Sequence, residues 1–190
     1  MRALATWSGA VAGLFLILVG SLIQAALVVP LPELPPPVLP LPSTWQVPAL
    51  LLCSLVAGPR AGVIASVAYL TIGLVDLPVF YGGGGIAYVL TPGFGYLAGF
   101  IPAAWLTGRL AMQSGMNDIP RLTLAAMAGL LIIQLCGLLN LLLGAGLGRW
   151  QQPLAELLFS YSLGPLVAQL ALCCAAGLLA RCMRGLLWVE

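Results

Sequence analysis

The segment DLPVFYGGGGIAYVLTPGFGYLAGF, residues 76–100, divides a strongly apolar sequence near its middle. It contains seven glycines and two prolines, and both residue types destabilise the interior of a helix. Irregular backbone at membrane depth is tolerated only where it is buried in protein or lines a cavity. We therefore expect this segment to connect two helices and to mark a functional site.

The composition around this connector excludes an ordinary soluble domain. Of the 190 residues, 62% are hydrophobic and only 6% are charged, whereas soluble domains carry about 25% charged residues. The apolar runs are long and continuous, which favours helices over a β-barrel. We predict an all-α, multi-pass protein of the cell (plasma or inner) membrane, in contact with the lipid bilayer and not with nucleic acid.

Breaks in the apolar runs predict six transmembrane helices within one domain, residues 1–190. A span needs about 20 apolar residues, and the first run is longer than a signal-peptide core, so we interpret it as a retained span. Seven prolines within residues 30–42 predict an extended loop, and Gly58-Pro59-Arg60 predicts a turn. The expected spans are residues 7–29, 44–57, 61–75, 94–110, 122–143 and 155–182.

The arginines predict the orientation. Six spans place both termini on one side, and cytoplasmic loops collect Arg and Lys. With cytoplasmic N- and C-termini, six of the seven arginines lie inside and Arg149 alone lies outside. The proline-rich loop and the connector then share the outer side, where we expect a ligand site.

The connector has the composition of a lid over a ligand. Its glycines allow close approach of the backbone, and the adjacent aromatic rings suit an apolar, ring-shaped ligand. A flexible connector is the alternative. No GK[ST] sequence follows the glycines and the chain has no lysine, which argues against a nucleotide site. The candidate lid residues are Phe80, Tyr81, Gly82, Gly83, Gly84, Gly85 and Tyr88.

Other side chains argue against catalysis. The chain has no histidine, five acidic residues and five cysteines outside any CxxC pair, so we expect no enzyme, no metal site and no cofactor. In the first helix, Ala5, Gly9 and Gly13 recur every four residues. Such a stripe allows close approach of another helix, either from a partner or from within this protein.

Four motifs together resemble the BioY family, the biotin-binding S components of energy-coupling-factor (ECF) vitamin transporters. They are TWQ (44–46), AGPRAG (57–62), LPVFYGGGG (77–85) and TPGFGYLAGF (91–100). The resemblance covers residues 44–110 well and the last two spans loosely. It implies a six-helix substrate-binding component that takes up biotin from outside. The alternatives are another small vitamin, a biotin precursor, or a membrane assembly or scaffold protein.

The same resemblance implies partners. Family members pass the ligand inward with a transmembrane coupling subunit and two ATPase subunits, and their first helix docks on the coupling subunit. For this reason we favour the partner interpretation of the small-residue stripe.

The chain departs from the family in one motif. Near the start of the last helix the family carries an acidic residue and, three positions later, a lysine, and this sequence has Pro165 and Ala168 there. Polar residues elsewhere are therefore candidates for holding a carboxylate or a ureido ring. These candidate ligand residues are Gln46, Asp76, Gln134, Asn140, Arg149 and Gln169.

Each candidate also has a purely structural interpretation. Gln46 follows Ser43 at capping-box spacing, and Gln134 and Asn140 suit hydrogen bonds between helices. Asp76 suits a loop, and Arg149 suits contact with lipid headgroups. Trp150 and Tyr161 suit interfacial anchors.

Overall fold

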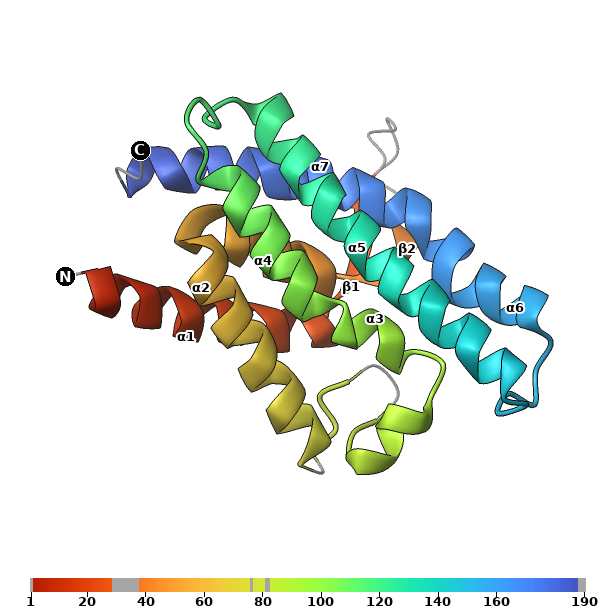
Figure 1. The fold of residues 1–190 in the computed structure, drawn as a ribbon. Helices are drawn as coiled ribbons and strands as arrows, with labels where there is room; N and C mark the ends of the chain where they lie inside the picture. The colour runs from red at the N-terminus through yellow and green to blue at the C-terminus, as the bar shows by residue number, and fades with distance from the viewer. Residues whose placement is uncertain (1, 29–37, 76, 81–82, 188–190) are drawn as a thin grey trace.

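The computed structural model describes residues 2–28, 38–75, 77–80 and 83–187. Within them the chain is mostly helical, with one small antiparallel sheet (Figure 1). The elements in order are α1 (Arg2–Leu22), β1 (Gln24–Val28), β2 (Val38–Thr44), α2 (Gln46–Leu74), η1 (Ile86–Leu90), α3 (Phe94–Ala98), α4 (Phe100–Ala111), α5 (Ile119–Gly146), α6 (Leu154–Leu158), the π-helical turn η2 (Phe159–Leu163) and α7 (Gly164–Leu186).

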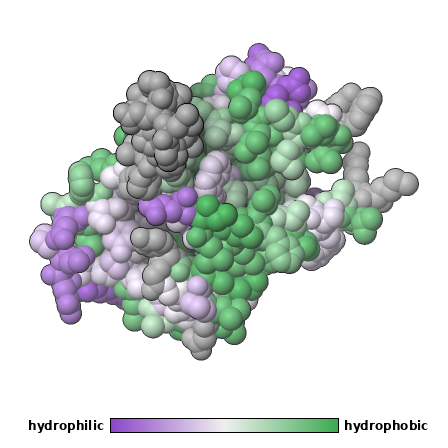
Figure 2. Space-filling model, turned by 180° about the vertical axis from the view of Figure 1, so that it is seen from behind, coloured by the Kyte–Doolittle hydropathy of each residue, from purple (hydrophilic) through white to green (hydrophobic). Residues whose placement is uncertain are grey.

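Four helical segments of the described chain are long and apolar enough to cross a membrane. On the face shown in Figure 2, hydrophobic residues cover the middle of the molecule, and hydrophilic residues gather mainly at the left and at the upper right. Together these features indicate a membrane protein, as predicted. The segments are Ala3–Leu22, Gln46–Leu74, Ile119–Gly146 and Leu154–Leu186.

Helix α2 consists of two arms joined at Gly58. Gly58 has φ 85° and ψ 178° inside the helix, a conformation that glycine adopts without a Cβ clash, and Pro59 follows it. A Cβ on Gly62 would overlap Ser54, and Gln46 donates a hydrogen bond to Tyr69. In each pair the two residues are separated from Gly58 by nearly the same number of positions in the sequence, so the arms run antiparallel. This confirms the turn predicted at Gly58-Pro59-Arg60.

The small-residue stripe of α1 packs inside the protein. A Cβ on Gly9 would lie 2.6 Å from the Ala57 Cβ, and one on Gly13 would lie 3.0 Å from the Cys53 Cβ. Both neighbours belong to the first arm of α2, and only Ala5 of the stripe is exposed. The predicted partner interface is therefore wrong for Gly9 and Gly13, because α2 already occupies their surface.

The end of the first span also differs from the prediction. Helix α1 ends at Leu22, and residues 24–28 of the predicted span form strand β1 instead, while its predicted end, Val29, lies outside the described residues. Strand β1 pairs with β2 in an antiparallel two-stranded sheet, with Val28 opposite Val38. The all-α prediction must be corrected accordingly. The proline-rich sequence cannot continue a helix, whereas an edge strand tolerates prolines such as Pro40.

Two of the three later expected spans, residues 94–110 and 155–182, correspond to broken helices, whereas the span expected at 122–143 lies within the continuous helix α5. Gly99 separates α3 from α4, and the π turn η2 interrupts the last span before α7. Pro165 lacks the N–H that would bond the Tyr161 carbonyl in an α-helix, which accounts for the wider turn before it. The beginning of α1 and the end of α7 lie at the same end of the molecule (Figure 1).

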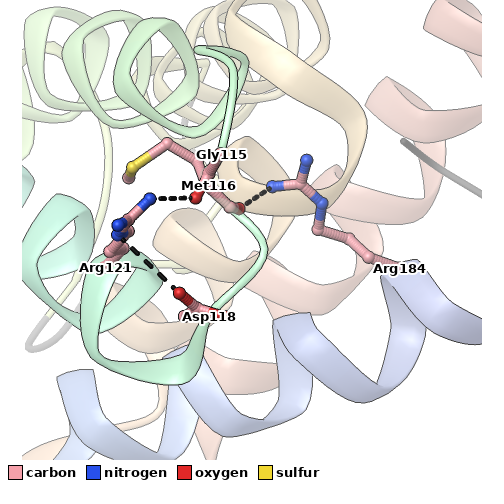
Figure 3. A network of polar contacts seen from close by, with 5 residues as sticks. All are labelled: Gly115, Met116, Asp118, Arg121 and Arg184. Carbon is pink, nitrogen blue, oxygen red and sulfur yellow. Dashed lines mark hydrogen bonds and ion pairs between the residues drawn. The ribbon is translucent and has the colours of Figure 1, made fainter.

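Arg184 fastens that end of α7 to the link between α4 and α5. Its side chain is 4% exposed, and Nη1 donates to the carbonyls of Ala111 (3.0 Å) and Met116 (3.2 Å). In the same link, Arg121 donates to the Gly115 carbonyl (2.6 Å) and lies 3.8 Å from Asp118, as Figure 3 shows. Arg184 therefore holds α7 to the link through hydrogen bonds to backbone carbonyls at and after the end of α4.

Candidate ligand-binding site

A cavity of about 610 Å³ lies where the C-terminal end of α1 meets the N-terminal end of α2. Its volume falls within the usual range for small-molecule sites. Aromatic rings, hydroxyls and side-chain amides from segments far apart in the sequence form its wall. The lining residues are Ser21, Leu22, Gln24, Ser43, Thr44, Gln46, Val47, Tyr88, Gly93, Tyr96, Leu97, Phe100, Ile133, Ser160, Tyr161, Pro165 and Gln169.

The glycine-rich connector folds back on α2. Phe80 and Gly83 exchange backbone hydrogen bonds of 3.0 and 3.1 Å, and the Gly85 N–H donates to the Gly73 carbonyl at 2.7 Å. A Cβ on Gly84 would overlap the Leu77 carbonyl oxygen. The close backbone approach expected of these glycines is therefore present, although Gly83, Gly84 and Gly85 themselves are not among the residues that line the cavity.

Phe80 packs between α2 and the connector, and Tyr88 is the connector residue beside it that lines the cavity. Phe80 is 3% exposed, with its ring centroid 5.4 Å from that of Tyr69 and 4.9 Å from that of Tyr88. Tyr88 lines the cavity. Burial raises the pKa of the Tyr88 phenol above its ordinary value, so this hydroxyl remains a neutral hydrogen-bonding group at physiological pH.

Gln46 joins the cavity to the connector. Its side chain is 6% exposed and lines the cavity, and Nε2 donates to the Tyr69 hydroxyl at 2.9 Å. That hydroxyl donates in turn to the Val79 carbonyl of the connector at 2.8 Å. The capping-box interpretation is wrong, because the N-cap of α2 is Trp45 and no side chain caps it.

Two glutamines form an amide pair beside the cavity. Gln134 Nε2 donates to Gln169 Oε1 at 2.8 Å, and Gln169 lines the cavity. This bond fixes the amide orientation of Gln169, so its Nε2 is the group available to a ligand. Pro165 also lines the cavity, and Ala168, next to Gln169 in the sequence, is 4% exposed. Among the described lining residues, tyrosines are the only ionisable groups.

Two other candidates lie away from the cavity wall. Asn140 Nδ2 donates to the carbonyls of Thr91 (3.3 Å) and Pro92 (3.1 Å), so it ties the end of the connector to α5. Arg149 is exposed in the link after α5 and does not line the cavity. The predicted residues Asp76, Tyr81 and Gly82 lie outside the described residues.

The structure adds aromatic residues that the sequence did not single out for binding. Tyr96 and Tyr161 line the cavity with stacked rings, 6.2 Å between centroids, and Tyr96 shares a hydrogen bond with Ser162. Ser160 and Tyr161 belong to the π turn, a feature frequent at functional sites. Pro165 in the next turn was the available sequence signal, since it disrupts regular helix at this point.

Comparison with known proteins identifies relatives of the chain. Residues 1–187 match the family model described as the BioY family. The probable biotin transporter BioY of Lysinibacillus sphaericus is 41% identical over 48% of this chain and 47% of its own length, so the chain spans about half of that relative. The biotin transporter BioY of Rhizobium etli is 37% identical over 65% of this chain and 72% of its own length.

The fold also matches a solved structure. The crystal structure of the S component for biotin from an ECF-type ABC transporter superposes with a TM-score of 0.74, covering 97% of this chain and 93% of the other. The sequence identity is 20%, so this likeness concerns the fold.

Proposed function

The chain belongs to the BioY family, and on this basis we propose that it is the membrane-embedded substrate-binding component of a biotin uptake transporter. The observation that carries the proposal is the cavity of about 610 Å³, lined by aromatic rings and neutral polar groups. Such a component binds its substrate and catalyses no reaction.

The cavity chemistry suits biotin. The ureido ring of biotin presents two N–H donors and one carbonyl acceptor, and its fused sulfur ring is apolar. The Gln169 amide and the Ser160 hydroxyl offer complementary groups, while Tyr96 and Phe100 offer apolar ring surface. A biotin precursor with the same ureido ring, or another small vitamin, is the second candidate.

The proposed topology has six transmembrane segments, with cytoplasmic termini, in the cell membrane. The two antiparallel arms of α2 supply two of them, and α3 continued by α4 supplies another. Arg60 and Arg109 lie toward the end of the molecule opposite the cavity. Since arginines collect on the cytoplasmic side, the cavity faces outward.

The connector is proposed as a lid whose position depends on its contacts with α2. The hydrogen bonds from Gln46 to Tyr69 and from Tyr69 to Val79 join the cavity wall to the connector. A ligand that contacts Gln46 or Tyr88 therefore stabilises the closed position, because it adds interactions that the open position lacks.

A transmembrane coupling subunit and two ATPase subunits are the proposed partners. Because Gly9 and Gly13 pack against α2, we place the docking surface on the outer face of α1, where Val11 and Phe15 are exposed.

Binding of labelled biotin to the purified chain in detergent tests the proposal. We expect saturable binding of one biotin per chain without ATP or partner subunits. Dethiobiotin tests the precursor alternative, and thiamine serves as a vitamin without a ureido ring. Failure to retain any of the three would contradict the proposal and favour a scaffold role. Equal retention of thiamine and biotin would also contradict it, because the cavity would then not select the ureido ring.

A further inference from the structure

A second cavity, of about 620 Å³, opens between α1, the second arm of α2 and α4. We call it the α1–α4 groove, defined by Trp7, Arg60, Val63, Ile64, Trp105 and Arg109. It does not belong to the ligand cavity. The ligand cavity contacts α1 at Ser21 and Leu22, whereas the groove contacts it at Trp7. At a rise of about 1.5 Å per residue, these positions lie roughly 20 Å apart along the helix.

Two exposed arginines supply positive charge to the groove. Arg60 and Arg109 come from different helices, and neither has a carboxylate within 4.0 Å among the residues that the structure describes, where the single ion pair joins Arg121 to Asp118. The Arg109 guanidinium lies 5.3 Å from the ring centroid of Trp105, a contact that orients the guanidinium and leaves its N–H donors free. Two guanidinium groups beside one cavity favour a phosphate group.

Apart from Thr6, the remaining wall is apolar, and it follows the helices toward the middle of the molecule. Val63 and Ile64 lie one helical turn beyond Arg60, and Trp105 lies one turn before Arg109. Trp7 and Trp105 are 60% and 51% exposed, as is typical of tryptophans at a membrane interface. The groove is therefore cationic at the end of the molecule and apolar along its length.

We propose that the α1–α4 groove binds one anionic phospholipid, with the phosphate headgroup on Arg60 and Arg109 and an acyl chain along Trp7, Val63 and Trp105. Basic pockets between transmembrane helices on the cytoplasmic side suit anionic headgroups. A free phosphate ion would use only the arginines, and a zwitterionic lipid would bring a second cation toward them. This proposal does not depend on which vitamin occupies the other cavity.

Native mass spectrometry of the full chain in detergent tests the proposal. The protein is mixed with equal amounts of phosphatidylglycerol and phosphatidylcholine of the same chain length, and bound lipid is counted. We expect one retained phosphatidylglycerol in preference to phosphatidylcholine. At about fivefold in affinity per arginine, the affinity of the double variant Arg60→Gln/Arg109→Gln for phosphatidylglycerol falls about 25-fold. Arg60→Lys/Arg109→Lys retains part of the preference, because it keeps charge without the planar fork.

Arg181→Gln is the matched control, since Arg181 is an exposed arginine on α7 outside the groove. It should leave the retained lipid unchanged, and every variant should unfold at the temperature of the parent chain. Four results would overturn the proposal: equal retention of both lipids, equal loss in Arg181→Gln and the double variant, full displacement of the lipid by millimolar inorganic phosphate, or a second copy of the chain retained in place of lipid.

Discussion

Replacement of Gly84 by alanine probes the lid most directly. A Cβ at this position would overlap the Leu77 carbonyl oxygen and lie 2.8 Å from the Leu77 carbonyl carbon and 3.1 Å from the Gly73 carbonyl oxygen. All three atoms are backbone, so no side-chain rotation relieves the overlap. Because Leu77 belongs to the connector and Gly73 to α2, the connector must change its own backbone conformation and its position on α2. That movement stretches the 2.7 Å hydrogen bond from Gly85 to Gly73.

The expected magnitude follows from this overlap. Insertion of a methyl group into a packed site costs about 1–3 kcal/mol. In the free protein the connector relaxes and avoids most of this cost. If ligand binding requires the connector in its closed position, the cost appears in the affinity, and the Kd for biotin rises about 5- to 150-fold.

Gly146→Ala is the matched control, because a Cβ on Gly146 would meet no atom within 4 Å. Both variants are measured by titration calorimetry with biotin and by thermal unfolding in the same detergent. A Kd for Gly84→Ala within twofold of the Gly146→Ala value, with both proteins folded, would show that the closed position of the connector is not needed for binding.

Three further predictions address the cavity and the helix ends. The double variant Gln134→Leu/Gln169→Leu removes both partners of one hydrogen bond, so it should unfold near the parent temperature yet bind biotin about 5- to 10-fold more weakly; parental affinity would exclude this amide from the site. Tyr88→Phe should weaken binding by the same factor at about pH 7 and pH 9, because a raised pKa keeps the phenol protonated throughout; a loss confined to pH 7 would contradict this. Arg184→Met should lower the free energy of unfolding by about 2 kcal/mol without changing the biotin Kd, whereas Arg181→Met should change neither; thermal unfolding with a binding titration on each variant checks both.

Several features of the fold could be read from local sequence. Long apolar runs predicted a helical membrane protein, and Gly58 followed by Pro59 predicted the turn between the arms of α2. The first prediction holds because a segment in lipid must satisfy its own backbone hydrogen bonds, which a helix does. The second holds because glycine adopts backbone angles that other residues avoid. The end of α1 was predicted wrongly, because residues 24–28 are apolar enough for a helix and become a strand only through pairing with residues 38–44.

The candidate site was predictable only in part. Tyr88 was predicted as an aromatic ring beside the glycines, and Gln46 and Gln169 as polar groups that could hold a carboxylate or a ureido ring; all three line the cavity. Phe80 and Asn140 were predicted on the same two grounds but hold the connector in place. Nothing in the sequence distinguished these two roles, since each depends on which neighbour the fold supplies.

Local composition was enough to predict that this chain enters a bilayer as helices and that its middle carries irregular backbone. Hydrophobicity and glycine conformation are properties of individual residues, so they need no neighbours from elsewhere in the chain. The packing of Gly9 and Gly13 against α2, and the stacking of Tyr96 on Tyr161 in the cavity wall, could be seen only in the folded chain. Both are contacts between residues far apart in the sequence. Which side chains pack together is decided by the arrangement of all the helices and not by the local sequence.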